Sequence, residues 1–244
     1  MPRFFLPQQS IDGGFLVLTG ENAVHAKVLR LKSGDEVVVC DGLGRDYRCT
    51  VSDVSAGQVS LVVRSAGPSG AEPAMQVSVF MAYAKSDKLE HVVQKATELG
   101  AAEIVAFPSA RCVSRPDDKS LAKKLERWQK IAASAAEQCG RGRIPAVRAA
   151  ATFAEAVAQA SAKPFSAFLY ENEQDVTFRS LAGCGPFPAA AVMTGPEGGF
   201  APSEVELAKR AGMQICTLGP RILRCETAPL CALTALMFAC GELD

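Results

Sequence analysis

Two short apolar runs between residues 189 and 228, each ending in glycine and proline, constrain the fold most strongly. The first run, Ala189–Met193, ends at TGPEGG, and the second, Ile215–Leu218, ends at GPR. Each run is short enough for a buried strand and is followed by a helical pattern. Ligands bind at the carboxyl ends of adjacent strands in open α/β sheets, and glycines let the backbone approach them closely. The segment therefore predicts a pocket between two loops, with ordinary strand-to-helix turns as the alternative.

The pattern around this segment alternates between strands and helices from residue 75 onward. Further strands are expected at Val77–Ala82, Ile104–Phe107 and Ser166–Tyr170. Helices are expected at Asp87–Leu99, Lys119–Cys139, Thr152–Ser161 and Leu230–Cys240, with a short one after GPEGGF. Such alternation predicts an α/β domain with a mostly parallel sheet covered on both faces.

The first part of the chain has a different pattern. Short strands are expected at residues 3–6, 15–18, 36–40, 47–51 and 59–63, with a helical pattern at 20–31. Regularly spaced short strands suggest a small barrel. Turn residues cluster at Gly67–Pro73, which is the best linker candidate. We therefore expect a β-barrel domain at 1–71 and an α/β domain at 74–244.

Charge is balanced over the chain, which has 26 Lys and Arg and 26 Asp and Glu, but it is unevenly distributed. Residues 111–148 carry ten basic and four acidic side chains, whereas residues 1–73 carry seven and eight. A local basic block suits a polyanionic partner, although a solvated helix face would look the same. The phosphate-binding candidates in it are Arg111, Arg115, Arg141 and Arg143. A smaller patch could form in the first domain from Arg3, Arg30, Arg45 and Arg48.

Several classes of protein are disfavoured. The nine cysteines form no C-x-x-C pair, which argues against a disulfide framework or a structural zinc site. With two histidines and no H-E-x-x-H, G-x-S-x-G or Walker A motif, we expect neither a metal hydrolase, a serine hydrolase nor a nucleotide-binding P-loop. No apolar run is long enough for a membrane span, and Met1–Phe4 does not begin a signal peptide. We expect a soluble, cytoplasmic protein without a metal.

The amino-acid sequences of these motifs resemble those of a known family. GPEGGF followed by LGPRILRCETA closely resembles the signature of the SPOUT RNA methyltransferases. Within them it looks most like the ribosomal RNA small-subunit methyltransferase E family, which methylates N3 of a uridine in 16S ribosomal RNA. The stretches KSDKLEHVVQKATELGAAEIVAF, RWQKIAASAAEQCGRGRIPAV and HAKVLRLKSGDEVVVCDGLGRDY are similar too. The resemblance thus covers essentially the whole chain.

The resemblance implies more than the pattern does. It implies that the α/β domain is a SPOUT domain with a deep trefoil knot, preceded by a PUA-like barrel that helps to dock RNA. It further implies a homodimer, S-adenosylmethionine as cofactor, and 16S rRNA, within the 30S subunit, as partner. The implied cofactor-binding residues are Leu169, Tyr170, Glu171, Thr194, Gly195, Pro196, Gly198, Gly199, Leu218, Gly219, Ile222, Leu223, Thr227 and Ala228.

Three charged residues are candidates for catalysis. Because uracil N3 carries a proton at neutral pH, the anion that forms when the proton leaves must be stabilised. Arg224 is the candidate for that role, Glu226 is a candidate base or the residue that orients Arg224, and Glu197 is a second carboxylate candidate. For each of the three, a structural loop ion pair remains the alternative.

Two helix starts in this region bear on the site. Thr227 could cap the last helix instead of touching the cofactor. Ala201 stands where the family has Ser or Thr after GGF, which removes a helix-capping bond worth about 0.5–2 kcal/mol and puts local rigidity in doubt.

Two rival functions remain open at this point. One is a SPOUT enzyme that modifies another base or a ribose 2′-hydroxyl. The other is a non-catalytic RNA-binding factor in ribosome assembly that has kept the fold. Cofactor binding would separate the second from an enzyme.

Overall fold

The structure is a computed structural model that describes all residues except 8–10, 12, 13, 86, 184, 186 and 244. The chain divides into two compact units. The first comprises residues 1–72 and 136–144, and the second comprises residues 73–135 and 145–244.

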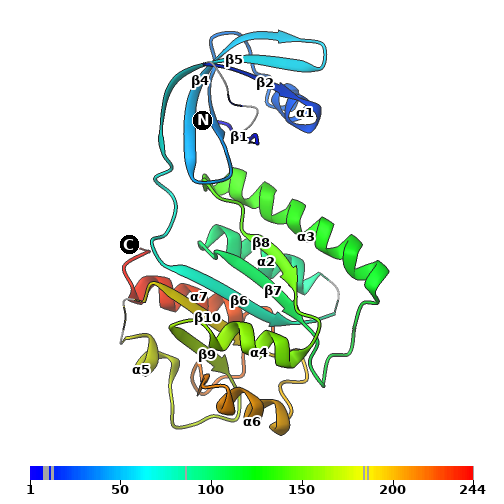
Figure 1. Cartoon of the computed structure of the whole chain (residues 1–244), viewed down its shortest axis with the longest axis vertical. Coiled ribbons are helices and arrows are strands. Elements are labelled where there is room, and N and C mark those ends of the chain that lie inside the picture. The colour runs from blue at the N-terminus through cyan, green and yellow to red at the C-terminus, as the bar shows by residue number, and fades with distance from the viewer. Residues whose placement is uncertain (8–10, 12–13, 86, 184, 186, 244) are drawn as a thin grey trace. The chain divides into compact units, whose positions relative to one another are not determined.

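The first unit is built on a five-stranded sheet with the order β1-β3-β4-β5-β2 (Figure 1). Its elements are β1 (Arg3–Phe5), β2 (Phe15–Thr19), α1 (Gly20–Val28), β3 (Glu36–Cys40), β4 (Arg45–Ser55) and β5 (Gln58–Pro68). β1 pairs with β3 in parallel, and the other neighbours are antiparallel. Alternate residues of β2 are buried, as expected for a strand with one face on the core. That core includes Phe4, Leu16, Leu18, Val39 and Leu61.

One polar contact and one aromatic contact organise this unit further. The carboxylate of Glu72 accepts hydrogen bonds from the guanidinium of Arg141 and from the backbone N–H groups of Gly142 and Arg143. Glu72 thereby ties the segment that follows β5 to residues 141–143. His25 packs its ring edge-on against Phe4, which fits a packing role.

The second unit is a six-stranded, fully parallel sheet with the order β11-β9-β10-β6-β7-β8. Its strands are β6 (Gln76–Ala82), β7 (Glu103–Phe107), β8 (Ala146–Ala149), β9 (Phe165–Leu169), β10 (Ala189–Thr194) and β11 (Gln214–Cys216). Its helices are α2 (Lys88–Glu98), α3 (Asp118–Cys139, which continues into the first unit), α4 (Phe153–Ser161), α5 (Phe178–Ala182), α6 (Pro202–Arg210) and α7 (Ala228–Ala239).

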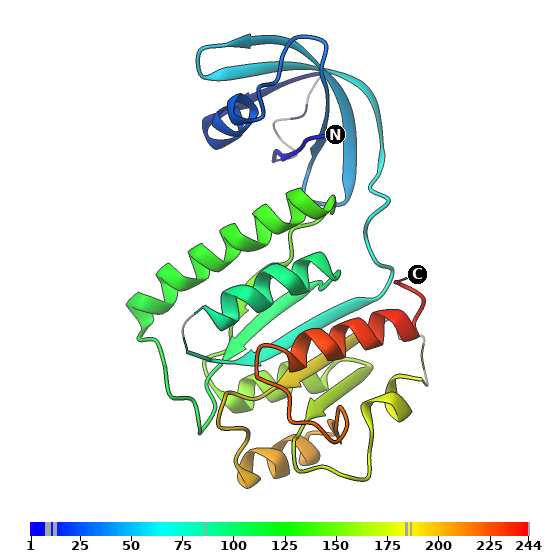
Figure 2. The same cartoon turned by 180° about the vertical axis from the view of Figure 1, so that it is seen from behind.

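Helices cover both faces of this sheet. α2 and α7 pack together on one face, whereas α4 and α6 pack on the other (Figures 1 and 2). Consequently the central strands are buried and mostly apolar: all five residues of β9 are buried, as are the last five of β10. Among the described residues, no helix has the length and apolar character needed to cross a membrane.

The register of the central strands creates the site. Leu169 of β9 pairs with Cys216 of β11, Phe168 pairs with Met193 of β10, and Thr194 pairs with Met81 of β6. Because all four strands are parallel, their carboxyl ends meet at one edge of the sheet. The loops after β9, β10 and β11 therefore converge there.

The expected elements are present, with shifted bounds. β4 and β5 are each eleven residues long, longer than the expected 47–51 and 59–63, because the pair continues as a twisted ribbon beyond the buried residues. β11 ends at Cys216, before the expected Leu218, because Thr217 turns back to bond Val176 and Phe178. β8 and α5 were not expected from the sequence.

Candidate functional site

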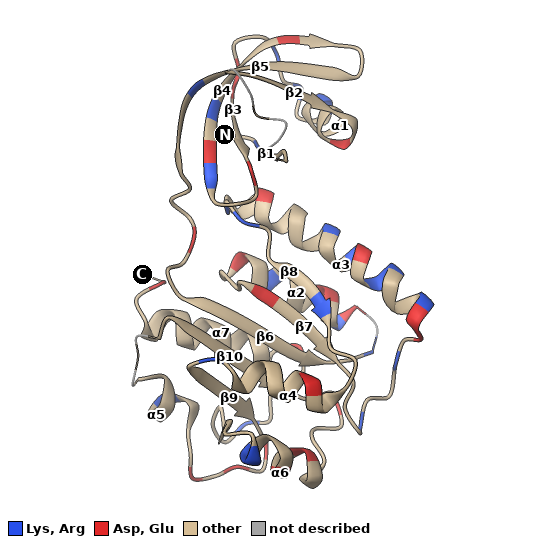
Figure 3. Ribbon diagram, in the orientation of Figure 1, with Lys and Arg blue, Asp and Glu red and all other residues tan. Residues whose placement is uncertain are grey.

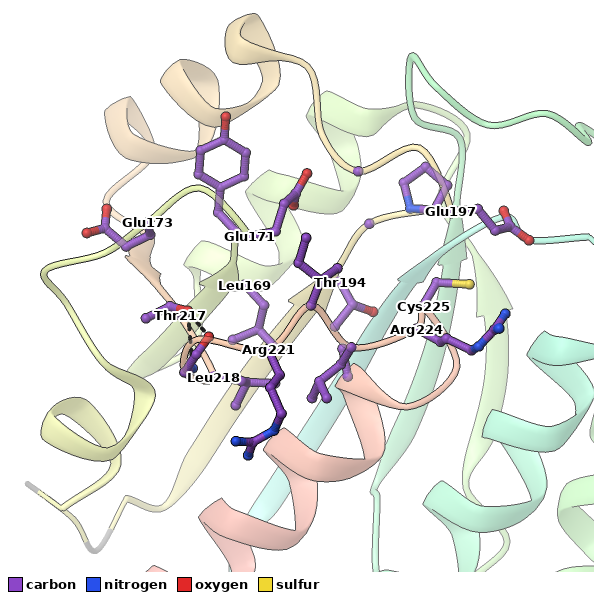
Figure 4. Close-up of a pocket in the computed structure, with 18 of the residues that line it drawn as sticks. Leu169, Glu171, Glu173, Thr194, Glu197, Thr217, Leu218, Arg221, Arg224 and Cys225 are labelled. Carbon is purple, nitrogen blue, oxygen red and sulfur yellow. Dashed lines mark hydrogen bonds between the residues drawn. The ribbon is translucent and has the colours of Figure 1, made fainter.

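A cavity of about 850 Å³ lies at the carboxyl ends of β9, β10 and β11 (Figure 4). This volume is within the roughly 300–1,000 Å³ typical of small-molecule sites. Its walls are three loops, 169–177, 194–199 and 217–225, together with Lys88 and Ala228. Glu197, Cys225 and Arg224 lie at one end of the cavity, and Glu173 and Thr217 lie at the other (Figure 4).

Glycine is required in the loop after β10 for reasons of space. A Cβ built on Gly199 would lie 2.0 Å from Oε1 of Glu171, and the residue has φ +65°. A Cβ on Gly198 would lie 3.1 Å from Cβ of Arg111. The backbone of this loop is thus pressed against side chains from two other loops, which leaves its remaining face to the cavity.

Phe200 anchors the same loop in the core. It is 1 % exposed and its ring centroid lies 4.1 Å from that of Phe168 and 6.5 Å from that of Phe107. The glycines therefore lie between a strand, β10, and an immobilised aromatic side chain. This arrangement fixes a segment that would otherwise have the backbone freedom of glycine.

Glu204 compensates for the absent cap at Ala201. Its buried carboxylate accepts hydrogen bonds from the backbone N–H of Ala201 (2.8 Å), the backbone N–H of Ala110 (2.8 Å) and the hydroxyl of Ser109 (3.2 Å). The start of α6 is thus tied to the loop after β7. Arg111 of that loop also donates to the carbonyl of Gly198 at 3.1 Å.

The other two loops are shaped by local polar contacts. Oε1 of Glu173 accepts from the backbone N–H groups of residues 174, 175 and 176, and these bonds hold the pKa of its carboxyl below the usual range. The hydroxyl of Thr217 accepts from the N–H of Gly219 and donates to its carbonyl, both at 3.2 Å. Hydrogen bonds within the chain therefore fix the conformation of each turn.

One ammonium group joins two loops at the end of the cavity. Nζ of Lys88 lies 3.3 Å from Oε1 of Glu197 and 3.2 Å from Oε2 of Glu226. Burial opposes ionisation of both carboxyls, but hydrogen bonds outweigh it, so the pKa of each is below its usual range. Burial likewise acts to lower the pKa of Lys88, but its carboxylate partners raise it above its usual value.

Two arginines on the loop after β11 stay available to a ligand. Arg221 and Arg224 are exposed, line the cavity and point in different directions (Figure 4). Within the part of the chain that the structure describes, neither forms an ion pair with a carboxylate.

The structure brings together nearly all the residues predicted to bind a cofactor. Thirteen of the fourteen line the cavity, in three segments: Leu169, Tyr170 and Glu171; Thr194, Gly195, Pro196, Gly198 and Gly199; and Leu218, Gly219, Ile222, Leu223 and Ala228. Ile222 does so at the rim, where it is 84 % exposed. Their role as cofactor ligands stays a prediction.

Thr227 does not line this cavity, nor does its hydroxyl cap α7. Its backbone is already helical, with φ −87° and ψ −41°, whereas a capping side chain needs an extended residue. Moreover, Pro229 in the first turn has no N–H to cap. The expectation of a side-chain cap was therefore wrong.

The structure places the three catalytic candidates in different surroundings. Arg224 and Glu197 line the cavity, whereas Glu226 is not among its lining residues and pairs with Lys88. The alternative of a structural loop ion pair describes the two carboxylates, which share one lysine. It does not describe Arg224.

The predicted RNA-contacting arginines differ in availability. Arg30, Arg45, Arg111, Arg115 and Arg143 are exposed. Arg141 is 4 % exposed and bound to Glu72, and Arg3 bonds to both carboxylate oxygens of Asp46. These two guanidinium groups are held by carboxylates of their own unit, and a role for either in RNA contact stays a prediction.

Sequence reasoning missed three residues that shape the site. Lys88, Phe200 and Glu204 each act across loops far apart in the chain, which no local pattern reveals. The signal that could have found Glu204 is its spacing of three residues after Ala201, the capping-box distance. Among the described residues, no group of three or more His, Cys, Asp and Glu side chains could hold a metal ion.

Comparison with known proteins matches this architecture. Residues 71–237 match the model of an RNA methyltransferase domain, and residues 18–64 match that of an RNA methyltransferase PUA domain. The chain is 35 % identical, over 98 % of its length and 96 % of the relative's, to "Ribosomal RNA small subunit methyltransferase E" of Bacillus subtilis.

Two solved structures resemble this chain over nearly its full length. A ribosomal RNA small subunit methyltransferase E of Neisseria gonorrhoeae, bound to S-adenosyl methionine, is 30 % identical with a TM-score of 0.88, covering 98 % of this chain and 97 % of that one. A methyltransferase of Legionella pneumophila, in complex with the cofactor SAM, is 31 % identical with a TM-score of 0.87, covering 97 % of both chains.

These likenesses confirm the expected fold class, an α/β SPOUT methyltransferase domain with a small N-terminal PUA-like β domain. The trefoil knot and the dimer stay predictions. The three-loop cavity fits a methyltransferase domain, and the relatives are similar to this chain over nearly its full length. The chain therefore belongs to the ribosomal RNA small subunit methyltransferase E family.

Proposed function

We propose that this protein is an S-adenosylmethionine-dependent methyltransferase that methylates N3 of a uridine in 16S ribosomal RNA. The single observation that carries the proposal is the cavity of three converging loops, because it holds thirteen residues that the family resemblance assigned to the cofactor. The relatives' names supply the RNA class, and two solved relatives contain the cofactor.

The residues present fit this cofactor. The cavity has the size of a nucleoside site, and the glycine loop presents bare backbone where a Cβ on Gly199 would collide. Leu169, Leu218 and Leu223 offer apolar walls for a base, and Glu171 offers an acceptor for hydroxyl groups. When bound, S-adenosylmethionine supplies an electrophilic methyl group.

The role of the chain in methyl transfer is to hold and stabilise the acceptor base. Arg224 lines the cavity and has no ion-pair partner among the described residues. A preorganised cation beside a developing negative charge stabilises it strongly. Arg224 therefore stabilises the uracil anion that forms as the N3 proton passes to solvent water. Because N3 lies on the pairing edge of the base, the uridine must be unpaired when it enters.

RNA contact is assigned to exposed cations in both units. Arg111 and Arg115 precede α3, whose own surface carries further Lys and Arg (Figure 3). In the first unit, which we assign to RNA docking as a PUA-like domain, Arg30, Arg45 and Arg143 are exposed. The partner is 16S rRNA, within the 30S subunit, which puts the enzyme's work in the cytoplasm.

We further propose a homodimer formed through α7. The inward face of this helix, which includes Leu233, Leu236 and Met237, is buried in the core. Its outward face still presents Phe238, 70 % exposed, beside exposed Cys231 and Ala235. An outward face of this composition suits a two-fold contact with a second copy.

The proposed function is tested by initial rates of methyl transfer from labelled S-adenosylmethionine to undermodified 30S subunits and to naked 16S RNA. Arg224→Ala is expected to lower kcat by about 100-fold while cofactor affinity by calorimetry stays within about threefold. Arg210→Ala, at the end of α6, is the matched control and should not change the rate. Cofactor binding without transfer to either acceptor would contradict the assigned substrate, and absence of cofactor binding would contradict enzymatic function.

A further inference from the structure

Lys88 is the residue at which three separate segments of the second unit meet. It is the first residue of α2, and its ammonium contacts Glu197 of the loop after β10 and Glu226 of the loop after β11. Its Nζ also lies 3.7 Å from Sγ of Cys225. The two loops carry most of the predicted cofactor ligands, and the second carries Arg224.

Further hydrogen bonds make this contact specific. Oε1 of Glu197 accepts the backbone N–H of Lys85 at 3.0 Å, so both Lys85, before α2, and Lys88, in α2, hold this carboxylate. The thiol of Cys225 donates to Oε2 of Glu226 at 3.3 Å. The side chains of Lys88, Glu197 and Glu226 are 23 %, 26 % and 22 % exposed, so the group is shielded from much of the solvent. Partial shielding makes such pairs stronger than fully exposed ones.

We propose that Lys88 is a positioning residue that clamps the two loops together and so fixes the cofactor cavity and the place of Arg224. This inference rests on the proposed function, because it concerns the same cavity. It assigns Lys88 a role that the motif analysis did not give it, and it assigns Glu197 and Glu226 to the clamp.

A lysine suits this role for a chemical reason. Its ammonium is a compact charge with three donors, which can serve two carboxylates at once. Without it, two carboxylates that both lie within 3.3 Å of one point would repel each other and push the loops apart. The pKa of each carboxyl is held below its usual range, which makes both carboxylates weak bases for the N3 proton.

The experiment measures cofactor affinity by calorimetry, and kcat and KM for both substrates, in a set of full-length variants. Lys88→Met removes the charge and keeps the length, Lys88→Arg keeps the charge, and Lys88→Met/Glu226→Gln also removes one of the repelling carboxylates. Lys95→Met, in the same helix and paired with Glu98 outside the cavity lining, is the matched control. Thermal unfolding of each variant reports its folding.

The clamp predicts an order of affinities. Lys88→Met weakens S-adenosylmethionine binding by about 10-fold, and Lys88→Arg stays within about threefold of the natural protein. The double variant binds at least about threefold more tightly than Lys88→Met, because it relieves the repulsion, but more weakly than the natural protein. In Lys88→Met, kcat also falls at saturating cofactor, because Arg224 is no longer held. Lys95→Met changes nothing.

Other results overturn the clamp. Equal cofactor affinity and kcat in Lys88→Met and the natural protein would exclude it. Affinity that Glu226→Gln does not restore would mean that Lys88 contacts the ligand directly. If Lys88→Met is too unstable to assay, affinity of the double variant equal to that of the natural protein would exclude the clamp. Failure of the natural protein itself to bind cofactor would refute the proposed function instead, so the two failures are distinguishable.

Discussion

At the scale of single residues, Gly199 shows how closely the cavity is built. Its positive φ of +65° favours glycine, and a Cβ would overlap the carboxylate of Glu171. A side chain here must therefore strain the backbone and displace Glu171, a predicted cofactor ligand. The two penalties act on different properties, stability and binding.

Gly199→Ala is accordingly expected to lower stability by about 1–2 kcal/mol and to weaken S-adenosylmethionine binding by about 10-fold. The control is Gly212→Ala, where φ is +87° but no atom lies within 4 Å of the added Cβ. It should lower stability by a similar amount without affecting binding. Chemical denaturation and calorimetry check both, and equal cofactor affinity in the two variants would contradict the steric account.

A second residue-scale prediction concerns pH. The pKa values of Glu197 and Glu226 lie below the usual range in the folded protein. Their ionised forms therefore stabilise the fold fully above the unfolded value of about 4.3, and this contribution is lost as pH falls through the lower folded values. The thermal midpoint of the natural protein should fall more steeply below about pH 4 than that of Glu197→Gln/Glu226→Gln. Parallel curves would show that the pair does not stabilise the fold.

At the scale of elements, the loop after β10 depends on its aromatic anchor. Phe200→Ala removes a side chain that is 1 % exposed and in contact with Phe168 and Phe107. It is expected to cost about 3–5 kcal/mol. Phe15→Ala, at a side chain that is 68 % exposed, should cost less than about 0.5 kcal/mol. A loss at Phe200 as small as that at Phe15 would mean that the glycine loop does not depend on the core.

Elements could be predicted from the sequence where burial leaves a pattern. Runs such as Ala189–Met193 are apolar throughout because both faces of the sheet are covered, and their strands were located within two residues. β8 and α5 were missed because each is only four or five residues long, and only one residue of β8 is fully buried. Thr227 was misjudged because capping depends on backbone angles that residue type does not determine.

The cavity itself could be predicted largely from the glycine motifs together with the family resemblance. Lys88 could not, because its two partners approach it only after β11, β9, β10 and β6 have paired. Arg141 was placed among RNA contacts because its neighbours are basic, whereas Glu72, far away in sequence, binds it. Such contacts are tertiary, and a pattern along the chain does not record them.

At the scale of the whole molecule, the exposed face of α7 predicts association. Light scattering at micromolar concentration should give the mass of two chains for the natural protein. Phe238→Asp should give the mass of one chain, because a charge within the proposed contact would be buried without a partner. Phe15→Asp, an equally exposed site in the first unit, should leave the dimer intact. A natural protein that is monomeric at this concentration would contradict the proposed dimer.

The measurement that tests the account most directly is nucleoside analysis of 16S RNA after incubation with the protein and S-adenosylmethionine. Undermodified 30S subunits are treated, the RNA is digested, and the methylated nucleoside is identified and located by mass spectrometry. The account predicts N3-methyluridine at a single position, and Arg224→Ala should abolish most of it. Methylation of a ribose or of another base would contradict the assigned acceptor, and an RNA that remains unmethylated although the protein binds cofactor would contradict the assigned substrate.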